Sequence, residues 1–224
     1  MSRLYDWTPA AVVFDCDGLL MDTEPCWSVA ETALFARRGL SFGPEQKAMV
    51  IGKSLAAAGD VLAGIFDEPG AGADLAAELL VLVAEVVTAE AEAMPGAFDL
   101  VDLVAASVPF AVASNSPRAL LEAALARGGF TGVFPVSVAA DEVDAPKPHP
   151  GMYLAACAAL GVEPAAALAF EDSVTGLRSA RAAGLRVVGV PTLAHQDFPA
   201  DVVVESLRDN DLLAWIRGWR SAGV

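Results

Sequence analysis

The chain has 224 residues, enough for one domain with a smaller insertion and too few for a large multidomain protein. Hydrophobic residues make up 55% of the sequence, so a buried core is expected, and neither disorder nor a disulfide-dependent fold is. The net charge of −15, from 14 basic and 29 acidic residues, argues against nucleic acid as a partner, because the protein would repel a phosphate backbone.

The predicted elements begin with a short apolar strand at 10–14 and continue into a long helical stretch. Residues 20–94 show helical periodicity throughout and no convincing β pattern, with glycine and proline breaks between the helices. Helices are expected there at 25–38, 44–51, 54–66 and 73–93.

After residue 108, short apolar runs alternate with amphipathic segments. The expected strands lie at 110–113, 133–138, 166–170, 185–190 and 202–204. The expected helices lie at 117–127, 150–160, 174–183 and 208–219. Such alternation predicts an α/β fold in which helices cover both faces of a buried parallel sheet.

The fold class is therefore α/β, with a Rossmann-like doubly wound parallel sheet as its core. We assign residues 1–19 and 95–224 to this core and residues 20–94 to an inserted small α-helical domain. The chain is expected to re-enter the core at Met94-Pro95-Gly96, a pair of breakers suited to a hinge.

Polar side chains follow four of the predicted strands. Ligands of open parallel sheets bind beyond the carboxyl ends of the strands, so these side chains should meet at one edge. The four segments are Asp15-Cys16-Asp17-Gly18, Ser114-Asn115, Pro146-Lys147-Pro148 and Glu171-Asp172-Ser173. Taken singly, each also suits an ordinary turn, helix cap or solvated loop.

Taken together, the four segments fit phosphoryl transfer. Oxygen ligands from Asp15, Asp172 and a backbone carbonyl near Asp17 suit Mg²⁺, and the adjacent carboxylates Glu171 and Asp172 would repel each other without a nearby cation. This combination of residues predicts a magnesium site at the sheet edge.

Lys147 and Ser114 are expected to neutralise and hydrogen-bond the oxygens of the transferring group. Ser116-Pro117 is expected to provide the cap and first position of the next helix, which leaves Ser114 without that role.

These four motifs, in this order, resemble those of the haloacid dehalogenase-like hydrolases, and the resemblance covers essentially the whole chain. The insertion resembles the small cap domain of that family. With Asp22-Thr23-Glu24-Pro25 after the first motif, the sequence is most similar to the phosphatases and the β-phosphoglucomutase-like enzymes. The resemblance implies Mg²⁺ held by Asp15, the main-chain carbonyl of Asp17 and Asp172, with Glu171 more peripheral.

The resemblance also implies roles in catalysis. Asp15 would be the nucleophile that forms an aspartyl-phosphate, and Asp17 would protonate the leaving oxygen and then activate water. Dehalogenases lack an aspartate at the position of Asp17, which favours chemistry at phosphorus. The expected substrate contacts are Asn115 and, on the cap side for their position and polarity, Glu24, Trp27 and Lys53.

Several features favour a cytoplasmic protein without a membrane partner. The three cysteines are an odd number without close spacing, which suits a reducing compartment. No apolar run reaches the roughly 18 residues of a membrane helix, and Asp6 and Pro9 lie where a signal peptide would be apolar. The oligomeric state is left open, and a monomer is compatible with the sequence.

We therefore expect a Mg²⁺-dependent phosphomonoester hydrolase for a small phosphorylated metabolite, with sugar phosphates as the expected class. The alternative is a β-phosphoglucomutase-like phosphosugar mutase, which forms the same intermediate but keeps water out. The resemblance favours the phosphatase, because Glu24-Pro25 is more similar to the phosphatases and the mutases tend to carry a histidine nearby, which the expected cap lacks. More remote alternatives are a phosphoacceptor signalling receiver, for which the insertion at 20–94 would have no purpose, and a non-catalytic binding protein of the same fold.

Overall fold

The structure, a computed structural model, describes residues 3–51, 53–192 and 198–219. The chain divides into two compact units. Thr23–Ala91 form the first, which we call the helical unit, and Met1–Asp22 with Glu92–Val224 form the second, which we call the core unit.

The core unit is built on a six-stranded parallel sheet with the order β5-β4-β1-β6-β7-β8. Its strands are β1 (Ala11–Phe14), β4 (Phe110–Ser114), β5 (Val136–Ala139), β6 (Ala167–Glu171), β7 (Arg186–Gly189) and β8 (Val202–Val203). Its α-helices are α5 (Ala97–Ala105), α6 (Arg118–Arg127), α7 (Gly151–Leu160), α8 (Val174–Ala183) and α9 (Asn210–Gly218). Single 3₁₀ turns are η1 (Arg3–Asp6), η2 (Ala140–Glu142) and η3 (Pro164–Ala166).

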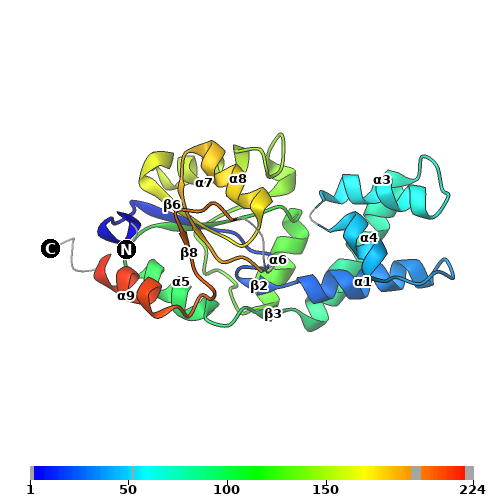
Figure 1. The fold of residues 1–224 in the computed structure, drawn as a ribbon, viewed down its shortest axis with the longest axis horizontal. Coiled ribbons are helices and arrows are strands. Elements are labelled where there is room, and N and C mark those ends of the chain that lie inside the picture. The colour runs from blue at the N-terminus through cyan, green and yellow to red at the C-terminus, as the bar shows by residue number, and fades with distance from the viewer. Residues whose placement is uncertain (1–2, 52, 193–197, 220–224) are drawn as a thin grey trace. The chain divides into compact units, whose positions relative to one another are not determined.

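Helices cover both faces of this sheet, which confirms the predicted α/β doubly wound fold. In Figure 1, α7 and α8 lie on one side of the sheet and α5 and α9 on the other. On one face, Val13 and Ala111 belong to the core cluster that includes α7 residues. Phe14, the next residue along β1, faces the other side of the sheet and stacks on Phe170. Because the inner strands are buried on both faces, their sequences are continuous apolar runs.

The order of the strands places a topological switch point between β1 and β6. The chain leaves β1 toward β4 and leaves β6 toward β7, so the two connections run in opposite directions. Phe14 pairs with Phe170, and both strands therefore end at the same level. Ligands bind beyond the carboxyl ends of strands at such a reversal, which is where Asp15 and Glu171 lie.

The helical unit contains α1 (Glu24–Ala36), α2 (Pro44–Val50), α3 (Leu55–Ile65) and α4 (Gly72–Glu90). The long helix α4 packs against α1 and α3. A Cβ atom at Gly59 would lie 2.2 Å from the carbonyl oxygen of Gly72, so the close crossing of α3 and α4 requires a glycine at this position.

The helical unit covers Thr23–Ala91 instead of the expected 20–94, so each of its two boundaries differs by three residues. The strand β2 (Met21–Asp22) pairs antiparallel with β3 (Glu92–Ala93) in a segment expected to be helical, and it joins residues 20–22 and 92–94 to the core unit. Strands of two residues are too short to give a β period in the sequence. Because β3 occupies Glu92–Ala93, α4 ends at Glu90 rather than at residue 93.

Two further differences concern the core unit. Helix α5 was not expected, although its buried residues Ala97, Leu100, Val101 and Val104 have helical spacing. The strand expected at 133–138 begins only at Val136, because the N–H of Val133 bonds to the carbonyl of Phe130 in a turn. Among the helices of the described ranges, none combines the length and the hydropathy that a membrane-spanning segment requires.

Candidate active site

The first motif follows directly after β1. The N–H of Asp15 still bonds to the carbonyl of Phe170, and the Asp15 side chain is buried. Gly18 has a φ of +84°, and a Cβ atom there would lie 2.3 Å from Oδ2 of Asp172. The motif therefore needs glycine at this position because the backbone lies directly against the carboxylate of Asp172.

Lys147 reaches the same place from the loop after β5 and η2. Its Nζ lies 2.6 Å from Oδ1 of Asp15 and 2.7 Å from Oε1 of Glu171, and it donates to the carbonyl oxygen of Ala113 at 2.9 Å. These contacts use all three donors of the ammonium group. The side chain of Lys147 is 3% exposed, so it is fixed inside the cluster rather than solvated.

Asn115 holds the backbone of Lys147 in position. Its Oδ1 accepts a hydrogen bond from the N–H of Lys147 at 2.8 Å, and its Nδ2 donates to the carbonyl of Lys147 at 3.2 Å. The amide thus links the end of β4 to the loop that carries the lysine. A contact of Asn115 with substrate stays a prediction.

The end of β6 supplies two buried carboxylates. Oε1 of Glu171 accepts from Lys147 and, at 2.5 Å, from the hydroxyl of Tyr153. Asp172 accepts from the hydroxyl of Thr192 at 3.0 Å. Glu171, expected to be more peripheral, is completely buried, and its carboxylate lies at the centre of these contacts.

Ser173 acts as the N-cap of α8, because its Oγ accepts from the N–H of Gly176 at 3.0 Å. This leaves Asp172 without a capping role. A Cβ atom at Gly176 would lie 1.8 Å from Oε1 of Glu171, so the first turn of α8 must carry a glycine where it packs on the glutamate.

Two serines from the end of β4 hold the carboxylate of Asp17. The Oγ atoms of Ser114 and Ser116 donate to Oδ2 of Asp17 at 2.7 and 3.0 Å. The N–H of Ser116 donates in turn to Oγ of Ser114 at 2.9 Å. This hydrogen-bonded set fixes the rotamer of the aspartate.

The expected capping role of Ser116 was wrong. The N-cap of α6 is Pro117, which has no side-chain cap bond, and the N–H of Arg118 donates instead to Oδ1 of Asp141 at 2.9 Å. Ser116 was therefore missed as a site residue. The alternation Ser-x-Ser at a strand end is the sequence signal that indicates two hydroxyls on one side of the chain.

The electrostatics of the cluster favour a bound cation. Asp15, Glu171 and Asp172 have ligand atoms within 4.8 Å of one another. Burial and then Glu171 raise the pKa of Asp15 well above its usual value, and the same two causes raise the pKa of Asp172 to about 7. Burial lowers the pKa of Lys147, but Asp15 and Glu171 outweigh it and raise that pKa.

One lysine thus faces three buried carboxylates, and the excess negative charge is costly in a buried place. A hard divalent cation prefers such oxygen donors and would balance the charge. Because the backbone of Gly18 lies close to the carboxylate of Asp172, this carboxylate is adjacent to the backbone of the first motif. The donor set therefore fits a divalent metal.

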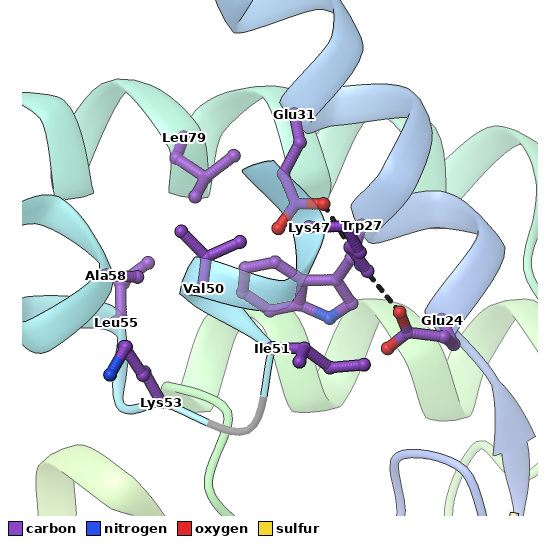
Figure 2. A pocket seen from close by; sticks show the side chains of 10 residues that line it. All are labelled: Glu24, Trp27, Glu31, Lys47, Val50, Ile51, Lys53, Leu55, Ala58 and Leu79. Carbon is purple, nitrogen blue, oxygen red and sulfur yellow. Dashed lines mark hydrogen bonds and ion pairs between the residues drawn. The ribbon is translucent and has the colours of Figure 1, made fainter. Parts of the chain in front are cut away.

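The three candidates in the helical unit line one pocket of about 180 Å³ (Figure 2). Glu24 and Trp27 belong to α1, and Lys53 precedes α3. The remaining lining residues are Glu31, Lys47, Val50, Ile51, Leu55, Ala58 and Leu79. Glu31 was not predicted as a site residue, although the spacing of 24, 27 and 31 places these residues on one face of α1.

Comparison with known proteins agrees with this arrangement. The sequence profile of the haloacid dehalogenase-like hydrolases matches residues 9–184, a range that contains all four motifs of the site. The chain belongs to the haloacid dehalogenase-like hydrolases. This confirms the resemblance, and the named phosphatases among the relatives of the chain support a phosphatase of this family.

Three relatives show how far the similarity of this haloacid dehalogenase-like hydrolase extends. The chain is 31% identical to the bifunctional riboflavin kinase/FMN phosphatase of Arabidopsis thaliana over 96% of its own length and 58% of that protein. It is 30% identical to hexitol phosphatase B of Escherichia coli strain K12, over 89% and 93% of the two chains. The crystal structure of CbbY from Rhodobacter sphaeroides in complex with phosphate superposes with a TM-score of 0.78 at 28% identity, covering 89% and 95%.

Proposed function

We propose that this haloacid dehalogenase-like hydrolase is a Mg²⁺-dependent phosphomonoesterase that works through an aspartyl-phosphate on Asp15. The observation that carries the proposal is the position of Lys147, whose ammonium contacts Asp15 and Glu171 at 2.6 and 2.7 Å. This contact brings the lysine motif, the first motif and the acidic motif of β6 to one point. A nucleophile, a cation and an acidic cluster at one sheet edge are the components of phosphoryl transfer.

In the first step, a carboxylate oxygen of Asp15 attacks phosphorus. A bond forms between this oxygen and phosphorus while the bond to the leaving alcohol oxygen breaks. The contact with Lys147 favours the ionised form of Asp15 that the attack requires. Asp17 donates its proton to the leaving oxygen, so that the alcohol departs neutral.

In the second step, Asp17 accepts a proton from water while the water oxygen attacks phosphorus. The bond to the Asp15 oxygen breaks, inorganic phosphate leaves, and both aspartates return to their starting forms. The hydroxyls of Ser114 and Ser116 orient Asp17 for both proton transfers. A contact of Ser114 with the transferring phosphoryl group stays part of the proposal.

Asp15, Asp172 and the main-chain carbonyl of Asp17 would hold the Mg²⁺, with Glu171 beside them. When bound, the ion supplies charge neutralisation for the phosphoryl oxygens and for the acidic cluster. The support for this assignment is the set of hard oxygen donors and their uncompensated negative charge.

We further propose that the helical unit is the cap and that Glu24, Trp27 and Lys53 contact the alcohol part of a sugar or sugar-alcohol phosphate. The named activity of hexitol phosphatase B supports this substrate class. A cytoplasmic location is also proposed, because an odd number of cysteines, all three of them buried, suits a reducing compartment.

The test is a panel of phosphorylated metabolites assayed with and without Mg²⁺, in which free phosphate and positional isomers are measured separately. We expect release of phosphate from sugar monophosphates that depends on Mg²⁺ and is lost in Asp15→Asn. Isomers formed without phosphate release would replace the phosphatase by a mutase. A protein that neither releases phosphate nor forms isomers would contradict the proposal.

A further inference from the structure

The pocket of the helical unit, which we call the Trp27 pocket, has an unusual charge arrangement. Its lining contains two carboxylates, Glu24 and Glu31, and two amines, Lys47 and Lys53. The formal charges of the lining therefore sum to zero. The volume of about 180 Å³ lies below the roughly 300–1,000 Å³ of pockets for drug-sized ligands, so a small fragment fits best.

Both carboxylates hold the same amine. Nζ of Lys47 lies 2.6 Å from Oε1 of Glu24 and 3.0 Å from Oε2 of Glu31 (Figure 2). The side chain of Glu31 is 6% exposed, and that of Lys47 is 19% exposed. The ammonium is therefore held between two carboxylates. The contact with Glu31 is shielded from water and is the stronger one, whereas the side chain of Glu24 is 55% exposed.

This arrangement disfavours an anionic ligand in the pocket. Lys47 has two carboxylate partners, so Glu24, Lys47 and Glu31 together carry one negative charge. A phosphate group approaching Lys47 would have to approach the carboxylates as well, and like charges repel it. Lys53 is the other amine of the described lining. It is exposed, as Glu24 is, so solvent and salt screen both charges alike, and the amine that an anion would meet inside the pocket is the already paired Lys47.

The same residues suit hydroxyl groups. Lys47 contacts one oxygen of each carboxylate, so the second oxygen of Glu24 and of Glu31 can accept a hydrogen bond from a ligand hydroxyl. Lys47 keeps one donor, which a ligand oxygen can accept. The indole ring of Trp27 projects into the pocket beside Val50 and Ile51 (Figure 2), and such an apolar face suits the C–H side of a polyol.

We propose that the Trp27 pocket selects a neutral, hydroxyl-bearing group, so that the preferred substrates carry a single phosphate, the one that is transferred. Glu31 and Lys47 become specificity-determining residues of the phosphatase. The inference rests on the proposed function in one respect, namely that the alcohol part of the substrate enters this pocket.

The experiment compares kcat/KM of the wild-type protein for monophosphates and for the corresponding bisphosphates of the same sugars and sugar alcohols. We expect the monophosphate to be preferred by at least about tenfold. Glu31→Gln and Glu24→Gln each remove one negative charge from the pocket and nearly keep the side-chain shape. In both variants we expect this preference to fall by about threefold or more, because a second phosphate is repelled less.

Glu78→Gln is the matched control. Glu78 lies on α4 and pairs with Arg37 and Arg38, and it is not among the residues that line the pocket. The substitution changes the net charge of the helical unit by the same amount as Glu31→Gln. We expect it to leave the ratio of the two kcat/KM values unchanged, and thermal unfolding verifies that all variants are folded.

The inference is overturned if the wild-type protein prefers bisphosphates, or if Glu31→Gln and Glu24→Gln shift the ratio no more than Glu78→Gln. Either result leaves the phosphatase proposal intact when monophosphates are still hydrolysed. If no phosphate ester of either class is hydrolysed, the proposed function itself fails. The two failures are therefore distinguishable.

Discussion

Nζ of Lys147 lies 2.6 Å from Oδ1 of Asp15, although 132 residues separate them in the chain. The contact depends on the parallel order of the sheet, because the ends of β1, β4 and β6 meet at one edge. Asn115 fixes it further by binding the backbone of Lys147 at both its N–H and its carbonyl. The lysine is thus positioned before any ligand binds.

Lys147→Ala removes the cation from this cluster. We expect kcat to fall by about 10²–10³-fold or more, the range for loss of one transition-state donor. Because Asp15 and Glu171 would lose their buried partner, the free energy of unfolding should fall as well, so both quantities are measured on the same preparation. A folded variant with an unchanged kcat would remove Lys147 from the mechanism.

Asp17→Asn removes the proposed acid and base while keeping the side-chain shape. We expect kcat to fall by about 10²–10⁴-fold, measured by release of inorganic phosphate. Ser116→Ala is the matched comparison, because Asp17 keeps its hydrogen bond from Ser114, and its kcat should fall less than that of Asp17→Asn. Equal effects in the two variants would contradict a chemical role for the aspartate.

Tyr153→Phe tests the support beneath Glu171. The variant loses the hydroxyl that donates to Glu171 at 2.5 Å and keeps the ring beside Lys147, whose Nζ lies 5.0 Å from the ring centroid. We expect the free energy of unfolding to fall by about 1.5–3 kcal/mol, as for a hydrogen bond to a charged group. Denaturant unfolding measures it, and an unchanged value would mean that the hydroxyl bond adds nothing.

Most strands and helices could be predicted from the sequence. Strands that are buried on both faces appear as apolar runs, and amphipathic helices show a clear helical period. The short pair β2 and β3 could not, because two residues carry no period. Helix α5 has the residue spacing of a helix, but it was not predicted because it lies just before the stronger apolar signal of β4. These differences arise where the local signal is short or adjoins a stronger one.

The four motif positions could likewise be predicted, because strand ends of a parallel sheet converge. Tyr153 could not, since it lies on α7 and meets Glu171 only through the packing of that helix on the sheet. The same holds for Lys47, whose contact with Glu31 depends on how α1 and α2 pack. A contact between two elements leaves no pattern in the sequence of either element, so such contacts could not be predicted.

The stability of the core unit should depend on pH through Glu142. The guanidinium of Arg118, and then the N–H of Ala139, hold the pKa of Glu142 below its usual value. A lowered folded-state pKa means that the stabilisation is complete above the unfolded pKa of about 4.3 and disappears as the pH falls through the folded pKa. Because the Glu142 side chain is 42% exposed, we expect less than about 1 kcal/mol.

Denaturant unfolding of the wild type and Glu142→Gln at a series of pH values measures this contribution. The wild type should be the more stable of the two at pH 7, and the difference should shrink as the pH falls below the unfolded pKa and through the folded pKa of Glu142. A difference that stays constant over this range would show that the ionisation of Glu142 plays no part.

The central claim is that Asp15 carries the phosphoryl group during turnover. The most direct measurement is mass spectrometry of peptides from enzyme quenched in acid while it hydrolyses a sugar monophosphate with Mg²⁺, with hydroxylamine trapping of the acyl-phosphate. The modification should lie on Asp15 and be absent from Asp15→Asn, which should not turn over. A phosphoryl group on another residue, or Asp15→Asn that releases phosphate at a near wild-type rate, would contradict the account.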